Sequence, residues 1–270
     1  MRRGYLDLGG RSTRARSIGG LQVAKKPTPD PLSPFSKEVR RWFEASFEGP
    51  TPAQAEGWQA IAGGSNALIC APTGSGKTLA SFLWGIDSLA RRPERLPGVK
   101  LVYVSPLKAL SYDIERNLKA PLRGIGADIS VAIRTGDTPQ SERAKMRRSP
   151  PDILITTPES LYLMLSSGAR EIFHSVEAAI IDEIHAVAAS KRGAHLAVTL
   201  ERLDHLVANS YSGSEKGPET TEIETRGAGR RIQRIGLSAT QRPLERIAGF
   251  LTGPNRDCEV VDAGEPKKLD

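Results

Sequence analysis

Short apolar runs recur along the chain and are separated by longer stretches in which apolar residues return at helical spacing. Runs of this length are typical of strands buried on both faces of a sheet. Their alternation with helical patterns predicts an α/β fold of three layers, in which helices cover both faces of a mostly parallel sheet. The runs that predict strands are residues 67–70, 100–104, 129–133, 153–155, 178–181 and 235–237.

The helical patterns near the first strand are the clearest. Residues 36–46 carry apolar side chains at helical spacing, and Ser36 is placed to cap the first turn. Residues 79–89 repeat the pattern directly after the first predicted strand. Since ligands of a parallel sheet bind at the carboxyl ends of its strands, the residues that follow each apolar run are candidates for a site.

The sequence A-P-T-G-S-G-K-T at residues 71–78 joins the first strand to the helix after it. Its glycines would let backbone N–H groups turn inward onto an anion, where the positive end of the helix also points. Lys77 would reach the β- and γ-phosphates of a nucleotide, and the Thr78 hydroxyl would hold Mg²⁺. The alternative is a glycine-rich turn, and Ala71 replaces the usual first glycine. The residues expected to bind nucleotide are Thr73, Gly74, Ser75, Gly76, Lys77 and Thr78.

Gln54 begins another predicted helix, shortly before the phosphate loop. Its side-chain amide has a donor and an acceptor, which complement the exocyclic amine and a ring nitrogen of adenine. Proline and glutamine also occur at helix starts that bind nothing. The position of Gln54 ahead of the phosphate loop is therefore what makes it a candidate contact to adenine.

The run at 178–181 ends in Asp182-Glu183-Ile184-His185. A carboxylate that follows a buried strand beside a phosphate loop is the expected second ligand for Mg²⁺, and an adjacent carboxylate can orient or deprotonate the attacking water. We assign the first role to Asp182 and the second to Glu183. Acidic residues also favour helix N-termini, which is the alternative. We expect no zinc site at His185, because no further ligands stand at suitable spacing.

The last run ends in Ser238-Ala239-Thr240, which places two hydroxyls on alternate residues. A helix cap ahead of Pro243 would explain them equally well. Together with His185 they suggest a contact between hydroxyl and imidazole that transmits the state of the nucleotide. His185, Ser238 and Thr240 are therefore predicted to couple the nucleotide to the rest of the site.

Composition describes an ordinary protein without membrane spans. Of its 270 residues, 39% are hydrophobic and 26% charged, and no apolar run approaches the roughly 18 residues of a membrane helix. Two cysteines favour neither a disulfide framework nor a metal cluster, which suggests the reducing cytoplasm. The net charge is +7, but residues 1–29 hold seven basic residues against one acidic residue. Total charge is therefore weak evidence for nucleic acid.

The domain boundaries follow from polar segments without periodicity. Residues 1–29 are predicted to be a disordered basic tail, with a transit peptide as the alternative. The folded domain is expected over residues 30–262. Residues 209–229 are predicted to be a flexible insertion, although an extra nucleic-acid contact through its arginines is the alternative. Residues 263–270 are expected to form a linker.

These motifs resemble those of superfamily 2 helicases of the DEAD/DEAH-box type. A-P-T-G-S-G-K-T, D-E-I-H and S-A-T, in that order and with P-T-P-A-Q upstream, resemble motifs I, II, III and Q. Residues 105–110, 134–137 and 157–161 resemble motifs Ia, Ic and Ib. The combination P-L-K-A-L, R-T-G-D-T, T-T-P-E-S-L and D-E-I-H is most similar to the large helicase-related (Lhr) family of bacterial and archaeal DNA helicases. The resemblance covers residues 32–262 apart from the insertion.

The resemblance implies a RecA-like P-loop NTPase domain that uses ATP and Mg²⁺ and grips one strand of nucleic acid by its phosphates. It further implies single-stranded DNA as the partner, with RNA or an RNA–DNA hybrid as alternatives, 3′-to-5′ movement and a role in DNA repair. Phe35 is the candidate for the aromatic residue that stacks on adenine in many relatives, although its spacing differs. The residues implied to contact nucleic acid are Pro106, Lys108, Arg134, Thr157 and Pro158.

The resemblance also implies a second RecA-like domain, which carries motifs IV to VI and the arginine fingers. Only thirty residues follow Thr240 in this sequence, too few for such a domain. Because an arginine finger is worth roughly 10³ to 10⁵ in rate, we expect weak ATP hydrolysis by the chain alone. Two other functions stay open: an RNA helicase of the DEAD-box type, against which His185 in place of aspartate argues, and a nucleotide-binding regulatory module that does not hydrolyse ATP.

Overall fold

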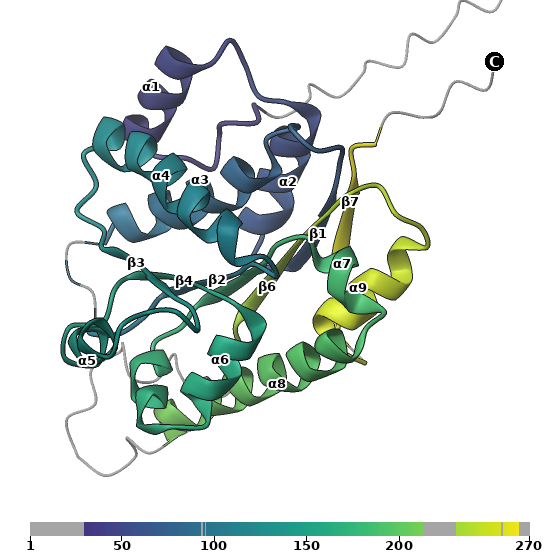
Figure 1. Cartoon of the computed structure of the whole chain (residues 1–270). Coiled ribbons are helices and arrows are strands. Elements are labelled where there is room, and N and C mark those ends of the chain that lie inside the picture. Colours follow the sequence, from purple (N-terminus) through teal and green to yellow (C-terminus); the bar gives the residue numbers. More distant parts are fainter. Residues whose placement is uncertain (1–29, 93, 95, 213–230, 255, 265–270) are drawn as a thin grey trace, which may run out of the picture. The chain divides into compact units, whose positions relative to one another are not determined.

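The computed structural model describes residues 30–92, 94, 96–212, 231–254 and 256–264, without the side chains of residues 108–112 and 211–212 (Figure 1). The predicted basic tail, most of the predicted insertion and the end of the predicted linker lie outside the described residues. The folded unit that begins at Pro31 contains all the helices and strands discussed below. No helix among the described residues is long and apolar enough to span a membrane.

A sheet of seven strands forms the middle of the domain, and each pairing between neighbouring strands is parallel. The strand order is β3-β4-β2-β5-β6-β1-β7. This confirms the predicted α/β fold, and each of the six predicted strands is present within a few residues. The strands are β1 (Asn66–Cys70), β2 (Leu101–Val104), β3 (Val131–Arg134), β4 (Ile153–Thr156), β5 (Ala178–Ile181), β6 (Gln233–Ser238) and β7 (Cys258–Asp262).

Helices cover both faces of the sheet (Figure 1). Alternate residues of one strand belong to different cores: Ala67 and Ile69 of β1 join one apolar cluster, whereas Leu68 and Cys70 join the other. The first cluster includes α1 (Lys37–Ser46), α2 (Pro52–Ala62), α3 (Lys77–Ala90) and α4 (Lys108–Ile125). The second includes α5 (Gln140–Arg148), α6 (Pro158–Leu165), η1 (Gly168–Phe173), α7 (Ile184–Ala188), α8 (Lys191–Ser212) and α9 (Leu244–Thr252).

Two features of the fold differ from the sequence predictions. Strand β7 is not among the predicted runs, because only Val261 of its five residues is buried at this edge of the sheet. Helix α8 continues to Ser212, so the first four residues of the interval predicted to be a flexible insertion, 209–212, are helical instead. Val207, which precedes these residues in α8, is buried in the second apolar cluster.

The first two helices begin as their sequences indicate. Ser36 caps α1, since its side chain accepts a hydrogen bond from the Val39 N–H at 3.4 Å. Its own N–H donates to Asp87 of α3 at 3.0 Å, which ties α1 to the helix after the phosphate loop. Thr51 and Gln54 form a capping box at the start of α2. These caps place both helices beside the phosphate loop.

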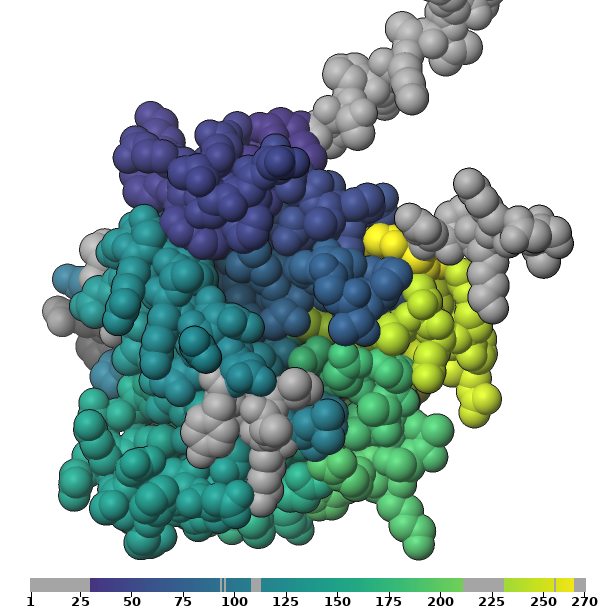
Figure 2. Space-filling model, turned by 45° about the horizontal axis from the view of Figure 1, so that its top comes forward, coloured from purple at the N-terminus to yellow at the C-terminus, as the bar shows by residue number. Residues whose placement is uncertain are grey.

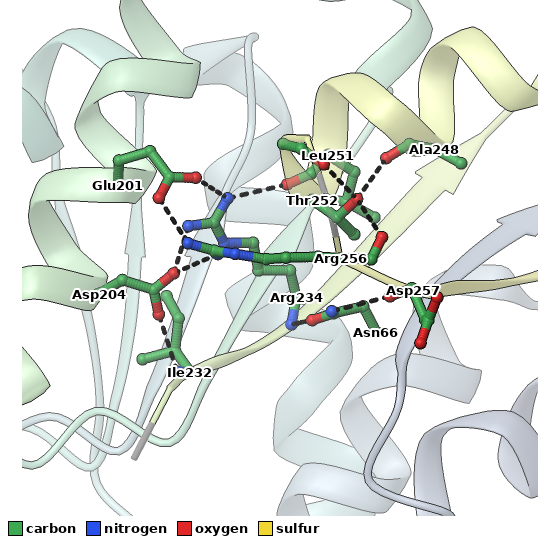
Figure 3. Close-up of polar contacts among 11 residues, drawn as sticks. Asn66, Glu201, Asp204, Ile232, Arg234, Ala248, Leu251, Thr252, Arg256 and Asp257 are labelled. Atoms are coloured by element: carbon green, nitrogen blue, oxygen red, sulfur yellow. Dashed lines mark hydrogen bonds and ion pairs between the residues drawn. The ribbon is translucent and has the colours of Figure 1, made fainter. Parts of the chain in front are cut away.

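A buried ion cluster lies at the amino-terminal edge of the sheet, opposite the strand ends that carry the predicted site (Figure 3). Arg234 of β6 is only 1% exposed and pairs with Asp204 and Glu201 of α8. Arg256 pairs with the same two carboxylates at 2.6 Å each. Asp204 also accepts the Ile232 N–H at 2.9 Å. The cluster thus joins α8, β6 and the segment before β7.

Candidate nucleotide-binding site

Residues 71–76 form a tight loop between β1 and α3, as the motif predicts. Gly74 and Gly76 have φ angles of 83° and 80°, in the left-handed region that side chains rarely adopt. A Cβ atom on Gly76 would also lie 2.5 Å from the Gln54 amide nitrogen. The loop opens onto the N-terminus of α3, whose fourteen residues direct their positive end at it. The geometry fits an anion.

Lys77 lies inside this loop and is 7% exposed. Its ammonium donates hydrogen bonds to the carbonyl oxygens of Ala71 at 2.6 Å and Pro72 at 2.8 Å. Burial lowers the pKa of Lys77, and the nearby carboxylates of Glu183 and Asp182 offset part of that shift. The Lys77 side chain is thus held against the start of the loop, near both carboxylates.

Asp182 follows β5 and is 7% exposed. Its Oδ1 accepts the Glu183 N–H at 2.9 Å, and its Oδ2 accepts the hydroxyl proton of Tyr103. Burial raises the pKa of Asp182, the Glu183 charge adds to this, and the Tyr103 hydrogen bond and the Lys77 charge oppose it. Burial and Asp182 in turn raise the pKa of Tyr103 well above its ordinary value, so Tyr103 remains a hydroxyl donor.

Glu183 has a φ of 44° and a ψ of 40°, and among the described residues it is the one position other than glycine with a positive φ. This conformation costs an L residue roughly 1–2 kcal/mol. Strain of this kind concentrates at functional sites, where the surrounding structure holds it in place. Here the strained turn directs the Glu183 side chain into the same cavity as Lys77.

His185 joins Glu183 to the end of β6. Its Nδ1 accepts the Ala239 N–H at 3.2 Å and lies 3.3 Å from the Ser238 hydroxyl. A backbone N–H can only donate, so Nδ1 carries no proton, and in the neutral ring the proton sits on Nε2, 3.4 Å from Glu183 Oε2. The predicted contact between His185 and Ser238 is therefore present. Thr240 is exposed and makes no described hydrogen bond to His185.

A cavity of about 420 Å³ brings the predicted residues together, and its size is in the range of small-molecule sites. In the described structure, the buried Ser75 hydroxyl in the adjoining loop has no hydrogen-bond partner, as expected for a donor that awaits an anion. Thr51 holds this loop through a hydrogen bond to the Ser75 carbonyl at 2.8 Å. The predicted residues that line the cavity are Thr73, Gly74, Gly76, Lys77, Thr78, Asp182 and Glu183.

Gln54 is 4% exposed and its amide is used within the protein. Its Oε1 accepts the Thr51 N–H at 2.9 Å in the capping box, and its amide nitrogen faces Gly76 of the phosphate loop. Gln54 therefore supports the loop. Its contact with adenine stays a prediction.

The expectation that Phe35 stacks on adenine is wrong. The ring is 6% exposed and packs edge-on against Trp58, with ring centroids 4.9 Å apart. A ring buried in this way has no face open to a base. The aromatic side chains that line the cavity are instead those of Trp42, Phe47 and Phe82. Figure 2 shows the purple residues of α1 next to the teal residues of α4, above the blue segment that contains the phosphate loop.

The residues predicted to contact nucleic acid follow β2, β3 and β4, three neighbouring strands at one end of the sheet order. Pro106 and Pro158 are buried, and Pro158 begins α6. The Lys108 side chain lies outside the described residues. Thr157 is 3% exposed and caps α6, with its hydroxyl bonded to Ser160. A phosphate contact by Thr157 would therefore compete with that cap, and it stays a prediction.

Arg134 at the end of β3 belongs to a group of arginines that the motif did not single out. Burial lowers the pKa of Arg134, and the charges of Arg143 and Arg147 on α5 lower it further. Arg143 donates to the carbonyls of Gly136 and Thr138 at 2.7 Å each, which fixes it over the loop after β3. Three like charges therefore gather at this corner of the sheet. Such a group favours an anionic partner.

Comparison with known proteins gives consistent results. The model of the DEAD/DEAH box helicase family matches residues 51–247. An Lhr helicase of Mycolicibacterium smegmatis is 52% identical over 236 residues, and the match covers 83% of this chain. The ATP-dependent helicase Lhr-Core of Methanothermobacter thermautotrophicus is 43% identical over 249 residues, or 86% of this chain. These matches span only 14% and 26% of the relatives' own lengths.

A solved structure agrees with the sequence matches. The Mycobacterium smegmatis helicase Lhr bound to ssDNA and AMP-PNP superposes with a TM-score of 0.76 at 50% sequence identity. The match covers 88% of this chain and 28% of that chain.

Proposed function

This chain belongs to the DEAD/DEAH box helicase family, and we propose that it is the ATP-binding motor domain of an Lhr-type DNA helicase. Such a domain would couple ATP hydrolysis to movement in the 3′-to-5′ direction along one DNA strand. Support for the Lhr type comes from relatives of 52% and 43% identity, and from the similar helicase bound to ssDNA and AMP-PNP. A role in DNA repair belongs to the same proposal.

One observation carries this proposal: Lys77, Asp182 and Glu183 converge on one cavity beside a left-handed phosphate loop. Lys77 and the loop N–H groups would bind the β- and γ-phosphates. Glu183 would orient the attacking water and accept its proton. His185 would hold the Glu183 side chain through its Nε2 proton, and Ser238 would link that ring to the end of β6.

The donor set at the mouth of the loop fits Mg²⁺. Thr78 and Asp182 line the same cavity and present a hydroxyl and a carboxylate, the hard oxygen ligands that this ion prefers. When bound, Mg²⁺ would neutralise part of the phosphate charge and so assist transfer of the γ-phosphoryl group. The part played by this chain is to hold the two oxygen ligands in place.

The charges of the residues that line the cavity indicate that a further cation comes from outside this chain. Among the described residues that line the cavity, Lys77 is the only basic one, and it faces two carboxylates. A triphosphate gathers more negative charge in the transition state than one lysine and Mg²⁺ offset. We therefore propose that a second RecA-like domain closes over the nucleotide and supplies arginine.

The nucleic-acid part of this proposal is tested by equilibrium binding of single-stranded DNA and RNA oligonucleotides at several salt concentrations. We expect tighter binding of DNA, with little dependence on sequence and weaker binding as salt rises, because the contacts go to phosphates. Tighter binding of RNA would favour an RNA helicase of the DEAD-box type instead.

Arg134→Ala should weaken binding of all single-stranded DNA sequences alike. Since each lost phosphate contact lowers the salt dependence, the slope of log affinity against log salt should become shallower by about 0.7. Arg246→Ala is the matched control, because Arg246 is an exposed arginine of α9, which packs against β6, β1 and β7 at the opposite end of the strand order from β3. An unchanged slope in the Arg134 variant would exclude this residue from the interface.

A further inference from the structure

Tyr103 lies on β2, beside β5, the strand that Asp182 follows. Its side chain is fully buried, and its ring stacks on Phe82 of α3 with centroids 4.6 Å apart and 19° between the ring planes. The hydroxyl donates a hydrogen bond to Asp182 Oδ2, and hydrogen bonding from the nearby Thr78 side chain lowers the Tyr103 pKa against the larger effect of burial. One phenol therefore connects the two side chains that we propose as Mg²⁺ ligands.

The donor and acceptor capacities of the three side chains determine which of Thr78, Tyr103 and Asp182 donates to which. An ionised carboxylate only accepts, so the Tyr103 proton points at Asp182. The Tyr103 oxygen is then left as an acceptor for the Thr78 hydroxyl, a direction that agrees with the lowering of the Tyr103 pKa by Thr78. With its proton turned toward Tyr103, the Thr78 oxygen keeps its lone pairs for a cation.

The Asp182 carboxylate is held at both oxygens. Oδ2 accepts from Tyr103, and Oδ1 accepts from the Glu183 N–H at 2.9 Å. Each oxygen retains a further lone pair, so either can bind a metal ion or one of its waters. Stacking on Phe82 fixes the plane of the phenol and hence the position of its hydroxyl.

We infer that Tyr103 is a positioning residue for Mg²⁺, which orients Thr78 and Asp182 through a single hydroxyl without touching the nucleotide. This rests on the proposed binding of nucleotide together with Mg²⁺. Supporting groups that orient metal ligands commonly alter metal affinity by 10- to 100-fold when they are removed.

The test is Tyr103→Phe, which removes the hydroxyl and keeps the stacked ring. Affinity for a fluorescent ADP analogue is titrated against Mg²⁺, starting from EDTA. We expect the affinity for the analogue in EDTA to be unchanged. The Mg²⁺ concentration at which half of the Mg²⁺-dependent gain in affinity is reached should rise roughly tenfold, because one hydrogen bond to a charged group is lost. Tyr162→Phe is the matched control, since the Tyr162 ring lies beside Arg202 on the other face of the sheet.

Three outcomes would contradict the inference or its premise. An unchanged Mg²⁺ midpoint would remove Tyr103 from the metal site. An equal loss of affinity in EDTA and in Mg²⁺ would make the hydroxyl merely structural. If nucleotide binding by the unaltered protein does not respond to Mg²⁺, the proposed function itself fails. This outcome is distinct from a failure of the Tyr103 inference, because it is seen without any variant.

A measurement on the unaltered protein covers the case in which Tyr103→Phe does not fold. With ring-labelled tyrosine, NMR should show a slowly exchanging hydroxyl proton from Tyr103, because this residue is buried and hydrogen-bonded. Its signal should shift when Mg²⁺ is added to the ADP-bound protein, and not when Mg²⁺ is added alone at the same concentration. A signal that ignores Mg²⁺ in both cases would overturn the inference.

Discussion

Glu183→Gln should leave ATP binding intact and reduce ATP hydrolysis roughly 10²- to 10⁴-fold, the usual contribution of a general base. The change removes the ability to accept a proton but preserves the shape of the side chain, whose backbone is already held at a φ of 44°. The Glu183 N–H keeps its bond to Asp182 at 2.9 Å, so the metal ligand should not move. Release of radiolabelled phosphate in the presence of single-stranded DNA resolves even slow turnover.

The matched control is Glu245→Gln, because Glu245 is exposed in the first turn of α9, away from the cavity. It should hydrolyse ATP at the rate of the unaltered chain. Turnover retained in Glu183→Gln would refute the role of Glu183 as base. Lost ATP binding in that variant would mean that the side chain supports the loop rather than the chemistry.

Asp204→Ala should lower the free energy of unfolding by about 3–5 kcal/mol, the usual cost of removing one member of a buried ion pair. Arg234 is 1% exposed, and its Nε already has no hydrogen-bond partner in the described structure. Loss of Asp204 would also leave the buried Ile232 N–H unpaired. Urea unfolding followed by circular dichroism measures the change.

Glu201→Ala provides the comparison, because Glu201 pairs with the same two arginines but its side chain is 48% exposed. Solvent weakens such a pair, so we expect a loss of about 1 kcal/mol or less. Equal losses in the two variants would show that burial does not govern the strength of this cluster. Replacing Asp204 and Arg234 together by leucine and methionine should cost less than Asp204→Ala alone.

The sheet and the phosphate loop could be predicted because each is encoded locally. Buried parallel strands appear as continuous apolar runs, and the loop needs glycine where φ is positive, as at Gly74 and Gly76. Asp182 was predictable for the same reason, since it directly follows such a run. Strand β7 was not predicted, because an edge strand buries few side chains and here buries only that of Val261.

Other features depend on contacts between distant segments, which no local pattern encodes. Phe35 has an aromatic ring in the expected region, but that ring is buried against Trp58 of α2. In the sequence Tyr103 is an ordinary residue of an apolar strand. Its hydrogen bond to Asp182 arises only because β2 pairs with β5 in the folded sheet. Arg234 is likewise a buried charge inside a strand, and its partners come from α8. Arg234 stands directly before the predicted run 235–237, so the local pattern did not mark it as buried.

The most direct test of the central claim is equilibrium binding of ATP with Mg²⁺ to this chain and to its Lys77→Ala variant. We predict saturable binding at one site, weakened roughly 10- to 150-fold in the variant by the loss of charge-assisted hydrogen bonds to phosphate. Lys37→Ala, which removes an exposed lysine of α1, should bind as the unaltered chain does. Unchanged ATP affinity in Lys77→Ala, or no saturable binding by the unaltered chain, would contradict the assignment of this loop as the nucleotide site.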